Sequence, residues 1–442
     1  MLLKKAFPVH RREVLSLVGA GGKTTTMFRL ADELVSQGWK VVATTTTMLW
    51  QEQAREPLIV DGDSHRVMDR VQAMLGDHHQ VTVAAAVDDV RRKLIGLQPS
   101  VVDALSALPE VDAVIVEADG AKGRSLKAPA DYEPVIPSST TLLVPMAAVD
   151  ALGQPLDERT VHRPEIARRL AGVEMGAPIT PALMSTLVLH PLGGLKAAPD
   201  GARIVPLLNK VQNTYVDSAR EVASLLLQEP RTDRVLLAAV AEEDPVKEVW
   251  GRVGAVVLAA GGSRRFGCPK QLLPWEGQTL LEHVVDTVLD SAVQQVVVVL
   301  GHQAGRMRRL LGNRPVRVVI NEDWEQGQSS SLRAGLEALP AGFQACLFVL
   351  ADQPNITSGF MDDLLTRYRR TLAPVVAPVH GGQRGNPVLF DRELFPDLLD
   401  LKGDEGGRSI LERHRSSIEL VEVQDESIFL DIDSVSDYEA AK

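Results

Sequence analysis

Short apolar runs alternate with helical patterns along the whole chain. Residues 14–18 and 40–44 are predominantly apolar runs, and the segment between them carries apolar residues on one helical face over 27–34. The same alternation returns at 253–259, where the run is almost entirely apolar. Continuous apolar runs of this length are typical of strands buried on both faces of a sheet, and the intervening patterns are typical of helices packed against it. The pattern predicts an α/β fold.

The chain is expected to form two domains. At 442 residues it exceeds the size of one ordinary core. An apolar run at 234–240 reads as a closing strand, and residues 241–245 after it are acidic and end in proline, as a linker would. We therefore expect one domain over residues 1–245 and another over 250–442. The second continues with an apolar helical face over 280–289 and apolar runs at 296–300, 316–320 and 345–350.

Composition narrows the class of protein. A net charge of −11 argues against a nucleic-acid-binding surface, although a local basic pocket can still hold phosphates. No apolar run approaches the roughly 20 residues of a membrane span, and residues 1–12 lack the apolar core of a signal peptide. Two cysteines are too few for a disulfide framework. These features predict a cytoplasmic protein with no nucleic-acid or membrane partner.

A glycine-rich loop follows the first apolar run and precedes a helix. Backbone N–H groups and the helix dipole favour a phosphate at such a position, the Lys23 side chain adds charge, and the Thr24 hydroxyl suits magnesium. The loop is not a standard Walker A motif, because that motif requires glycine where Leu17 stands; its compact Gly-x-x-Gly-Lys-Thr form is similar to the ATP-binding loop of the Mur ligases. A plain glycine turn is the alternative. The loop is predicted to bind ATP or GTP through Gly19, Ala20, Gly21, Gly22, Lys23, Thr24 and Thr25.

Two carboxylates follow the apolar run at 113–116. Glu117 and Asp119 would lie at the end of a strand, where they suit positioning of a metal ion or water, or else are simply solvated acids. Together with the glycine loop, the segment Glu-Ala-Asp-Gly-Ala-x-Gly-x-x-x-Lys-Ala-Pro at 117–129 resembles the YqeC-type accessory proteins of selenium-dependent molybdenum hydroxylases, over roughly residues 1–240. That resemblance implies an apo molybdenum hydroxylase or its chaperone as partner.

Two further segments of this half carry weaker signals. Asn209 and Lys210 follow an apolar run, as in base-reading Asn-Lys-x-Asp motifs, but position 212 is Gln, which argues against guanine recognition. The segment 162–165 also resembles the YqeC-type proteins, and no chemistry is assigned to its His-Arg pair.

The loop after the run at 253–259 combines glycines with cations, which suits a triphosphate. Its sequence Leu-Ala-Ala-Gly-x-Ser-x-Arg-x-Gly-x-x-Lys at 258–270 resembles the signature loop of the GT-A-like nucleotidyltransferases, and most of all that of the molybdenum cofactor cytidylyltransferases. The related guanylyltransferases typically have Leu-Ala-Gly-Gly here, so Ala260 favours CTP over GTP. Further segments up to residue 438 match the same family in order.

The resemblance implies roles for individual residues. Arg265 and Lys270 would stabilise the triphosphate, and Asp352 and Asp433 would hold Mg²⁺. Asp352 also follows an apolar run, where α/β sheets present their ligands, although an Asp-Gln-Pro turn there is equally consistent with a structural role. The residues implied to cradle CTP are Leu258, Ala259, Ala260, Gly261, Gly262, Ser263, Gly327, Ser329, Ser330 and Ser331. Those implied to face the pterin are Arg384, Gly385, Asn386, Pro387, Asp404 and Arg408.

Together these features predict a P-loop-like α/β domain fused to a GT-A-like, Rossmann-like nucleotidyltransferase domain. The resemblance implies transfer of CMP from CTP to the phosphate of molybdopterin, the organic part of the molybdenum cofactor, with release of pyrophosphate. Two alternatives remain: transfer to another phosphorylated substrate, and a non-catalytic carrier of the molybdenum cofactor. What the first domain does with its nucleotide does not follow from the sequence.

Overall fold

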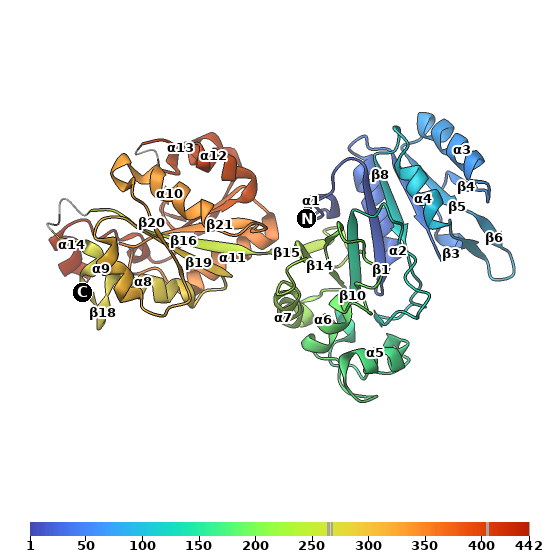
Figure 1. The fold of residues 1–442 in the computed structure, drawn as a ribbon, viewed down its shortest axis with the longest axis horizontal. Helices are drawn as coiled ribbons and strands as arrows, with labels where there is room; N and C mark the ends of the chain where they lie inside the picture. Colours follow the sequence, from blue (N-terminus) through green and yellow to red (C-terminus); the bar gives the residue numbers. More distant parts are fainter. Residues whose placement is uncertain (263–265, 267, 404–405, 442) are drawn as a thin grey trace. The chain divides into compact units, whose positions relative to one another are not determined.

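The chain folds into two compact units, Met1–Trp250 and Gly251–Lys442. This computed structural model describes residues 1–262, 266, 268–403 and 406–441. Each unit is a layered α/β fold with helices packed against a sheet (Figure 1). The acidic segment 241–245 lies within the first unit, because the chain continues after it as strand β15 (Val246–Gly251), which is hydrogen-bonded to β14 (Arg234–Ala238) in the first sheet.

The first unit is built on a ten-stranded sheet. Its strands follow the order β15-β14-β13-β10-β1-β8-β2-β5-β4, and β12 pairs with β10 beside this path. The bounds of the strands not yet given are β1 (Glu13–Gly19), β2 (Val41–Thr45), β4 (Leu58–Val60), β5 (Gln80–Ala84), β8 (Ala113–Glu117), β10 (Leu142–Ala148), β12 (Arg203–Ile204) and β13 (Leu207–Asn209).

Strand β1 lies at the centre of this sheet and pairs in parallel with β8 and β10, with Leu15 opposite both Ile115 and Leu142. The chain places β2, β4, β5 and β8 on one side of β1, and β10, β12, β13, β14 and β15 on the other. Strand order thus reverses at β1. In open α/β sheets, ligands bind outside the carboxyl ends of the strands at such a reversal.

Helices cover this sheet, and small strand groups extend from it. Helix α2 buries Met27, Leu30 and Leu34, as the helical pattern predicts. The helices are α1 (Leu3–Ala6), α2 (Lys23–Val35), α3 (Ser64–Asp77), α4 (Pro99–Ser106), α5 (Pro164–Ala171), α6 (Pro181–Leu189) and α7 (Val216–Leu226). The small antiparallel sheet contains β3 (Met48–Trp50), β6 (Ala86–Asp88) and β7 (Lys93–Ile95), and a separate pair is formed by β9 (Leu126–Lys127) and β11 (Val161–His162).

The second unit contains an eight-stranded mixed sheet. Its order is β20-β19-β16-β21-β24-β22-β23, and β25 pairs with β22. Strand β16 runs parallel to β19 and β21, whereas β24 is antiparallel to β21. The bounds are β16 (Val253–Ala259), β19 (Gln295–Leu300), β20 (Arg317–Ile320), β21 (Ala345–Leu350), β22 (Val375–His380), β23 (Gln383–Arg384), β24 (Val388–Asp391) and β25 (Ile418–Glu422).

Helices pack on this sheet through two apolar clusters. Helix α8 begins with a capping box, in which Thr279 and Glu282 satisfy each other's backbone N–H groups. The helices are α8 (Leu280–Leu289), α9 (Ala304–Leu311), α10 (Gln328–Glu337), α11 (Ser358–Thr371), α12 (Phe395–Leu399), α13 (Arg408–Arg413) and α14 (Val435–Ala441). A short hairpin joins β17 (Pro274–Trp275) to β18 (Gln278–Thr279). Across the described residues, none of the helices has both the length and the apolar character needed to cross a bilayer.

Candidate functional site

The predicted phosphate loop leaves β1 at the strand-order reversal and enters α2. Gly19, Gly21 and Gly22 adopt φ values of +89°, +89° and +115°, a region that residues with a Cβ rarely occupy. A Cβ on Gly21 would also lie 2.7 Å from the Cβ of Ala148. Ala20 is fully buried, so the loop backbone is held against β10. These glycines are therefore required by the path of the loop.

Four predicted residues meet at the start of α2. The Thr24 hydroxyl donates a 2.6 Å hydrogen bond to Glu117 Oε2. Lys23 Nζ donates to the Gly19 carbonyl at 2.6 Å and lies 3.2 Å from Asp119 Oδ1. Asp119 Oδ2 in turn accepts from the Gly19 amide at 3.0 Å. The structure thus places Glu117 and Asp119 beside the loop, as expected for a nucleotide site.

Glu117 is almost completely buried at the end of β8. Burial raises the pKa of its carboxyl above the ordinary value, and this outweighs the opposing effects of Lys23 and the Thr24 hydroxyl. A carboxylate and a hydroxyl in contact form an oxygen-donor pair of the kind that Mg²⁺ takes alongside phosphate oxygens. The donor chemistry of Thr24 and Glu117 therefore fits a magnesium ion.

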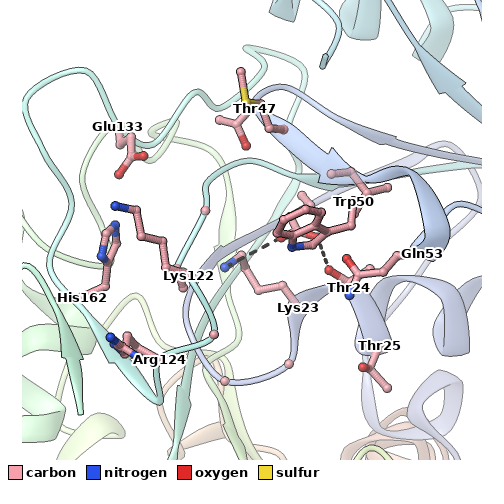
Figure 2. Close-up of a pocket in the computed structure, with 18 of the residues that line it drawn as sticks. Lys23, Thr24, Thr25, Thr47, Trp50, Gln53, Lys122, Arg124, Glu133 and His162 are labelled. Carbon is pink, nitrogen blue, oxygen red and sulfur yellow. Dashed lines mark hydrogen bonds and ion pairs between the residues drawn. The ribbon is translucent and has the colours of Figure 1, made fainter. Parts of the chain in front are cut away.

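A cavity of about 1150 Å³ opens at this loop; we call it the loop pocket. Figure 2 shows Lys23, Thr24 and Thr25 on one side of it, with Trp50 and Gln53 nearby. Across the cavity, the figure shows a second group of side chains that sequence analysis assigned no role: Lys122, Arg124, Glu133 and His162. The loop pocket therefore has two chemically distinct walls.

A buried lysine connects the two walls. Lys127 Nζ lies 2.8 Å from Asp119 Oδ2 and 2.8 Å from Glu133 Oε2, and the side chain is almost fully buried. Glu133 also pairs with Arg163 at 2.6 Å. Asp119 thus contacts the phosphate loop through Gly19 and the opposite wall through Lys127. Asp119, Lys127 and Arg163 lie in the two segments that resemble the YqeC-type proteins, whereas Glu133 lies outside both.

His162 stands among these cations as a neutral side chain. Burial lowers the pKa of its imidazole to about 4, and the charges of Arg163 and Lys127 act in the same direction. At neutral pH the ring therefore offers one hydrogen-bond donor and one acceptor without a charge. The sequence pattern assigns no chemistry to this His-Arg pair, whereas the structure places both residues in the loop pocket.

Asn209, which the sequence places in a segment similar to base-reading motifs, has a structural role. Its Nδ2 donates to the Gly21 carbonyl at 2.6 Å, and its Oδ1 accepts from the Val240 amide at 3.0 Å. The side chain is buried, and both ends of its amide are used to hold the phosphate loop. Lys210 lines the loop pocket and pairs with Asp150 at 2.7 Å. Asn209 is therefore a loop-positioning residue.

The second unit has a smaller cavity, of about 470 Å³, at the carboxyl ends of β16 and β21; we call it the strand-end pocket. Lys270 Nζ donates to Asp352 and lies 3.0 Å from Asp433 Oδ1. Burial lowers the pKa of Lys270, but the two carboxylates outweigh it, so that the pKa is raised above its ordinary value. Three of the four predicted catalytic residues therefore meet at one point. The fourth, Arg265, lies outside the described residues.

The two carboxylates converge on a cation, which here is the Lys270 ammonium. Aspartate oxygens that share one positive charge suit Mg²⁺ when triphosphate oxygens complete the coordination. Within the described ranges, the chain itself assembles no cluster of three or more His, Cys, Asp or Glu side chains able to hold a metal.

A third aspartate, Asp431, lies near this group. Gln353 Nε2 donates to Asp431 at 2.7 Å, and burial raises the pKa of Asp431. Asp431 was not among the predicted site residues, although it lies two residues before the predicted metal ligand Asp433.

The end of β16 and the loop after it line the strand-end pocket. Leu258, Ala260, Gly261 and Gly262 form part of its wall, whereas Ala259 is buried beneath. Gln271 shapes the loop by donating from Nε2 to the main-chain carbonyls of residues 259 and 261, at 3.3 and 3.0 Å. Ser263 lies outside the described residues.

The serine segment at the start of α10 is largely engaged in internal bonds. Gly327 and Ser331 line the strand-end pocket. The Ser329 hydroxyl donates 2.7 Å to the carbonyl of residue 403, and Ser330 donates to the carbonyls of residues 323 and 327. Asn321 Nδ2 donates to Ser330 and Ser331 at 2.8 and 3.0 Å. Because these hydroxyls are buried against the protein, Ser329 and Ser330 hold the segment in place and do not line the cavity. Asn321 is the residue that sequence analysis missed.

The segments implied to face the pterin lie outside the lining of the strand-end pocket. Arg384, at the end of β23, pairs with Glu412 at 2.6 Å. A Cβ on Gly385 would overlap the ring of Phe429, and Arg408 is exposed at the start of α13. Asn386 and Pro387 lie between β23 and β24, joined by a cis peptide bond. Asp404 lies outside the described residues.

Family models match both units. The model described as the YqeC protein matches residues 15–165, and the model described as the MobA-like NTP transferase domain matches residues 255–418. The two matches cover the phosphate loop and the strand-end pocket.

Known proteins match each unit over nearly their whole length. The first unit resembles a YqeC protein of uncharacterised function from Escherichia coli K12, at 30% identity over 241 residues, which are 53% of this chain and 91% of that protein. The second resembles nicotine blue oxidoreductase of Paenarthrobacter nicotinovorans, at 34% identity over 41% of this chain and 93% of that protein. It also resembles the molybdenum cofactor cytidylyltransferase of E. coli K12, at 26% identity over 43% of this chain and 95% of that protein.

The family assignment follows from both units. Each unit has a relative of at least 30% identity and covers that relative almost completely. In each unit, the residues matched by the family model include most of those that line a cavity beside the strand ends. The chain belongs to the YqeC family through its first unit and to the MobA-like NTP transferases, a nucleotidyltransferase family, through its second.

Proposed function

We propose that the second unit is a molybdenum cofactor cytidylyltransferase, which transfers CMP from CTP to molybdopterin. The observation that carries this proposal is the contact of Lys270 with Asp352, both of which line the strand-end pocket, and with Asp433 beside them. A cation and two carboxylates placed there suit a triphosphate that must be held with its metal and its leaving group in fixed positions.

The reaction joins two anions. A phosphate oxygen of molybdopterin forms a bond to the α-phosphorus of CTP, and the bond from that phosphorus to the bridging oxygen of pyrophosphate breaks. The attacking phosphate dianion has no proton to lose, so that no general base is needed. Lys270 stays protonated and neutralises charge on the triphosphate and the leaving pyrophosphate. A bound Mg²⁺ would add a second positive charge at the carboxylates of Asp352 and Asp433. Arg265 is proposed to assist Lys270.

Ala260 supports CTP as the nucleotide. Its methyl group belongs to the apolar cluster under α10, and the residue also lines the strand-end pocket. Guanylyltransferases of the resembling family typically have glycine at this position. We propose that the smaller pyrimidine base fits beside the Ala260 methyl group.

The first unit is proposed to bind ATP or GTP on the phosphate loop, with Mg²⁺ at Thr24 and Glu117. It would act in the maturation of a molybdenum hydroxylase, with the apo-enzyme or its chaperone as partner, in the cytoplasm. The contacts of Lys23, Thr24 and Glu117 support nucleotide binding.

A second candidate is an oxidoreductase, because the relative at 34% identity carries that name. Transfer of a nucleotide to another phosphorylated substrate and non-catalytic carriage of the cofactor are further alternatives. Lys270 and the two carboxylates favour transfer over carriage, since a carrier has no use for a metal-binding pair at a triphosphate site.

The test is transfer of label from [α-³²P]CTP to molybdopterin by the full chain with Mg²⁺. We expect the label in the pterin product, and a loss of at least about a hundredfold in Asp352→Ala, because one carboxylate and its share of charge stabilisation are removed. The matched control is Asp363→Ala, which removes an exposed aspartate from α11 outside the pocket.

Three outcomes would contradict the proposal. Equal labelling by Asp352→Ala and the native chain would exclude catalysis by this site. Label found only on a different phosphorylated acceptor would show that molybdopterin is not the substrate. Oxidation of NADH or NADPH with a dye acceptor, without label transfer, would favour the oxidoreductase.

A further inference from the structure

We propose that the loop pocket binds two phosphorylated ligands at once: a nucleotide on the phosphate loop, and the phosphate group of a second small substrate on the opposite wall. We call that wall, formed by Lys122, Arg124, His162 and Arg163, the basic wall. The inference rests on the proposed binding of ATP or GTP at the loop and assigns the rest of the same cavity.

The loop pocket is larger than a typical small-molecule site. The loop pocket measures about 1150 Å³, whereas small-molecule sites typically measure about 300–1000 Å³. A second cavity of about 660 Å³ shares Thr24, Thr25 and Gln53 with it and extends along α2 past Phe28 and Arg29. A nucleotide with its phosphates on the loop can place its nucleoside in this second cavity, which leaves the basic wall uncovered.

The positive charge of Lys122 and Arg124 favours binding of an anion to the basic wall. Lys122 and Arg124 are exposed on a tight turn, closed by the Arg124 amide donating 3.0 Å to the carbonyl of residue 121. The described residues provide neither side chain with a hydrogen-bond or ion-pair partner, and Figure 2 shows both beside His162 in the cavity. Clustered cations without counter-charge repel one another, and a phosphate between them removes that repulsion while accepting charge-assisted hydrogen bonds.

One part of the basic wall, Arg163, is held in place by other side chains. Arg163 donates to Glu133 Oε2 at 2.6 Å and to the Tyr132 hydroxyl at 3.2 Å. Glu133 is fixed by the buried Lys127, which reaches Asp119 beside the phosphate loop. For Arg163 the ordering cost of binding is therefore met before a ligand arrives, whereas the side chains of Lys122 and Arg124 are ordered by the phosphate itself. The same contacts link Arg163, through Glu133 and Lys127, to Asp119 beside the phosphate loop.

His162 adds a hydrogen-bond donor to the basic wall, and its pKa would report whether phosphate is bound. As a neutral ring it can donate one hydrogen bond to a phosphate oxygen without adding charge. A phosphate bound beside it would offset the surrounding cations that help to hold its pKa at about 4. The imidazole pKa should therefore rise when the basic wall is occupied.

The experiment is calorimetric titration of inorganic phosphate into the full chain saturated with Mg²⁺ and a non-hydrolysable ATP analogue. We expect one phosphate per chain, and acetate should not replace it. Lys122→Ala combined with Arg124→Ala should lower phosphate affinity at least about tenfold, because two charge-assisted contacts are lost, while the affinity for the analogue changes by less than about twofold. An NMR titration of His162 should show its pKa rising with phosphate.

A control double variant, Arg159→Ala with Arg169→Ala, removes the same charge from exposed positions outside the pocket. Equal losses in the two double variants would mean non-specific attraction and would overturn the proposal. So would the absence of phosphate binding while the loop is occupied, or equal binding of acetate. If the analogue itself fails to bind, the proposed role of the phosphate loop is wrong. Phosphate titration without the analogue, with Lys23→Ala as background, then still tests the basic wall.

Discussion

Thr24 and Glu117 are joined by a 2.6 Å hydrogen bond from the threonine hydroxyl to Glu117 Oε2, although 93 residues separate them. They meet because β1 and β8 are parallel neighbours whose carboxyl ends reach the same edge of the sheet. Thr24 opens the helix after β1, and Glu117 ends β8. The proposed magnesium site of the first unit lies at this contact.

Replacing Glu117 with glutamine should separate nucleotide binding from its metal dependence. Glu117→Gln keeps a side chain that can accept from Thr24 but removes the negative charge that favours Mg²⁺. We expect nucleotide affinity without metal to stay within about threefold of native, and the gain in affinity that Mg²⁺ gives the native chain to be largely lost. Titration of nucleotide with and without Mg²⁺ measures both. A variant with an unchanged metal effect would rule out Glu117 as part of the metal site.

Gly21→Ala should destabilise the first unit more than Gly38→Ala. Both glycines have positive φ, at +89° and +78°. A Cβ on Gly21 would overlap Ala148, whereas a Cβ on Gly38 meets nothing within 4 Å. We expect a loss of about 2–4 kcal/mol for Gly21→Ala and about 1 kcal/mol for Gly38→Ala, because only the first adds a steric clash to backbone strain. Denaturant unfolding measures the difference, and equal losses would contradict the described loop path.

Lys270 should contribute a constant amount to stability through neutral pH. Burial lowers its pKa, but Asp352 and Asp433 raise it above the ordinary value. A group whose folded pKa is raised stabilises the fold fully below its unfolded pKa, about 10.4 for lysine, and loses that effect as pH rises through the folded pKa. The stability difference between native chain and Lys270→Met should therefore stay flat from pH 6 to 9 and shrink at higher pH. A difference that shrinks already between pH 7 and 9 would contradict the assigned contacts.

His162 should make the first unit sensitive to acid. Its folded pKa, about 4, is below the unfolded value of about 6.5 for histidine. Between these values the unfolded chain binds the proton and the folded chain does not, so that stability falls as pH decreases. We expect the melting temperature to fall more between pH 7 and pH 5 in the native chain than in His162→Gln. Parallel thermal melts would show it, and identical decreases would place His162 in a less buried setting.

Sequence patterns predicted the parts of both sites that lie on or next to regular elements. Lys23 and Thr24 follow β1, Glu117 ends β8, and Asp352 follows β21. Because parallel strands present their carboxyl ends together, the position of each residue along the chain was enough to predict the edge of the sheet where it lies.

The basic wall could not be predicted in this way. Lys122 and Arg124 belong to one turn and Arg163 to another segment, and exposed cations in loops have no periodic pattern. The pairing of β9 with β11, together with the buried contacts of Lys127 and Glu133, brings these segments to one cavity. Similarly, the serine segment in the second unit did not reveal that its hydroxyls bond to the protein itself, because the Ser329 hydroxyl donates to the carbonyl of residue 403, which is distant in sequence.

The central claim, that the second unit is a cytidylyltransferase, is tested most directly by pyrophosphate release. The purified full chain would be given molybdopterin and Mg²⁺, with CTP or GTP in parallel. We predict release with CTP at a rate well above that with GTP, and none without molybdopterin. Release with GTP alone would show that Ala260 does not select the base, and absence of release with either nucleotide would contradict the assignment of a transferase site to Lys270, Asp352 and Asp433.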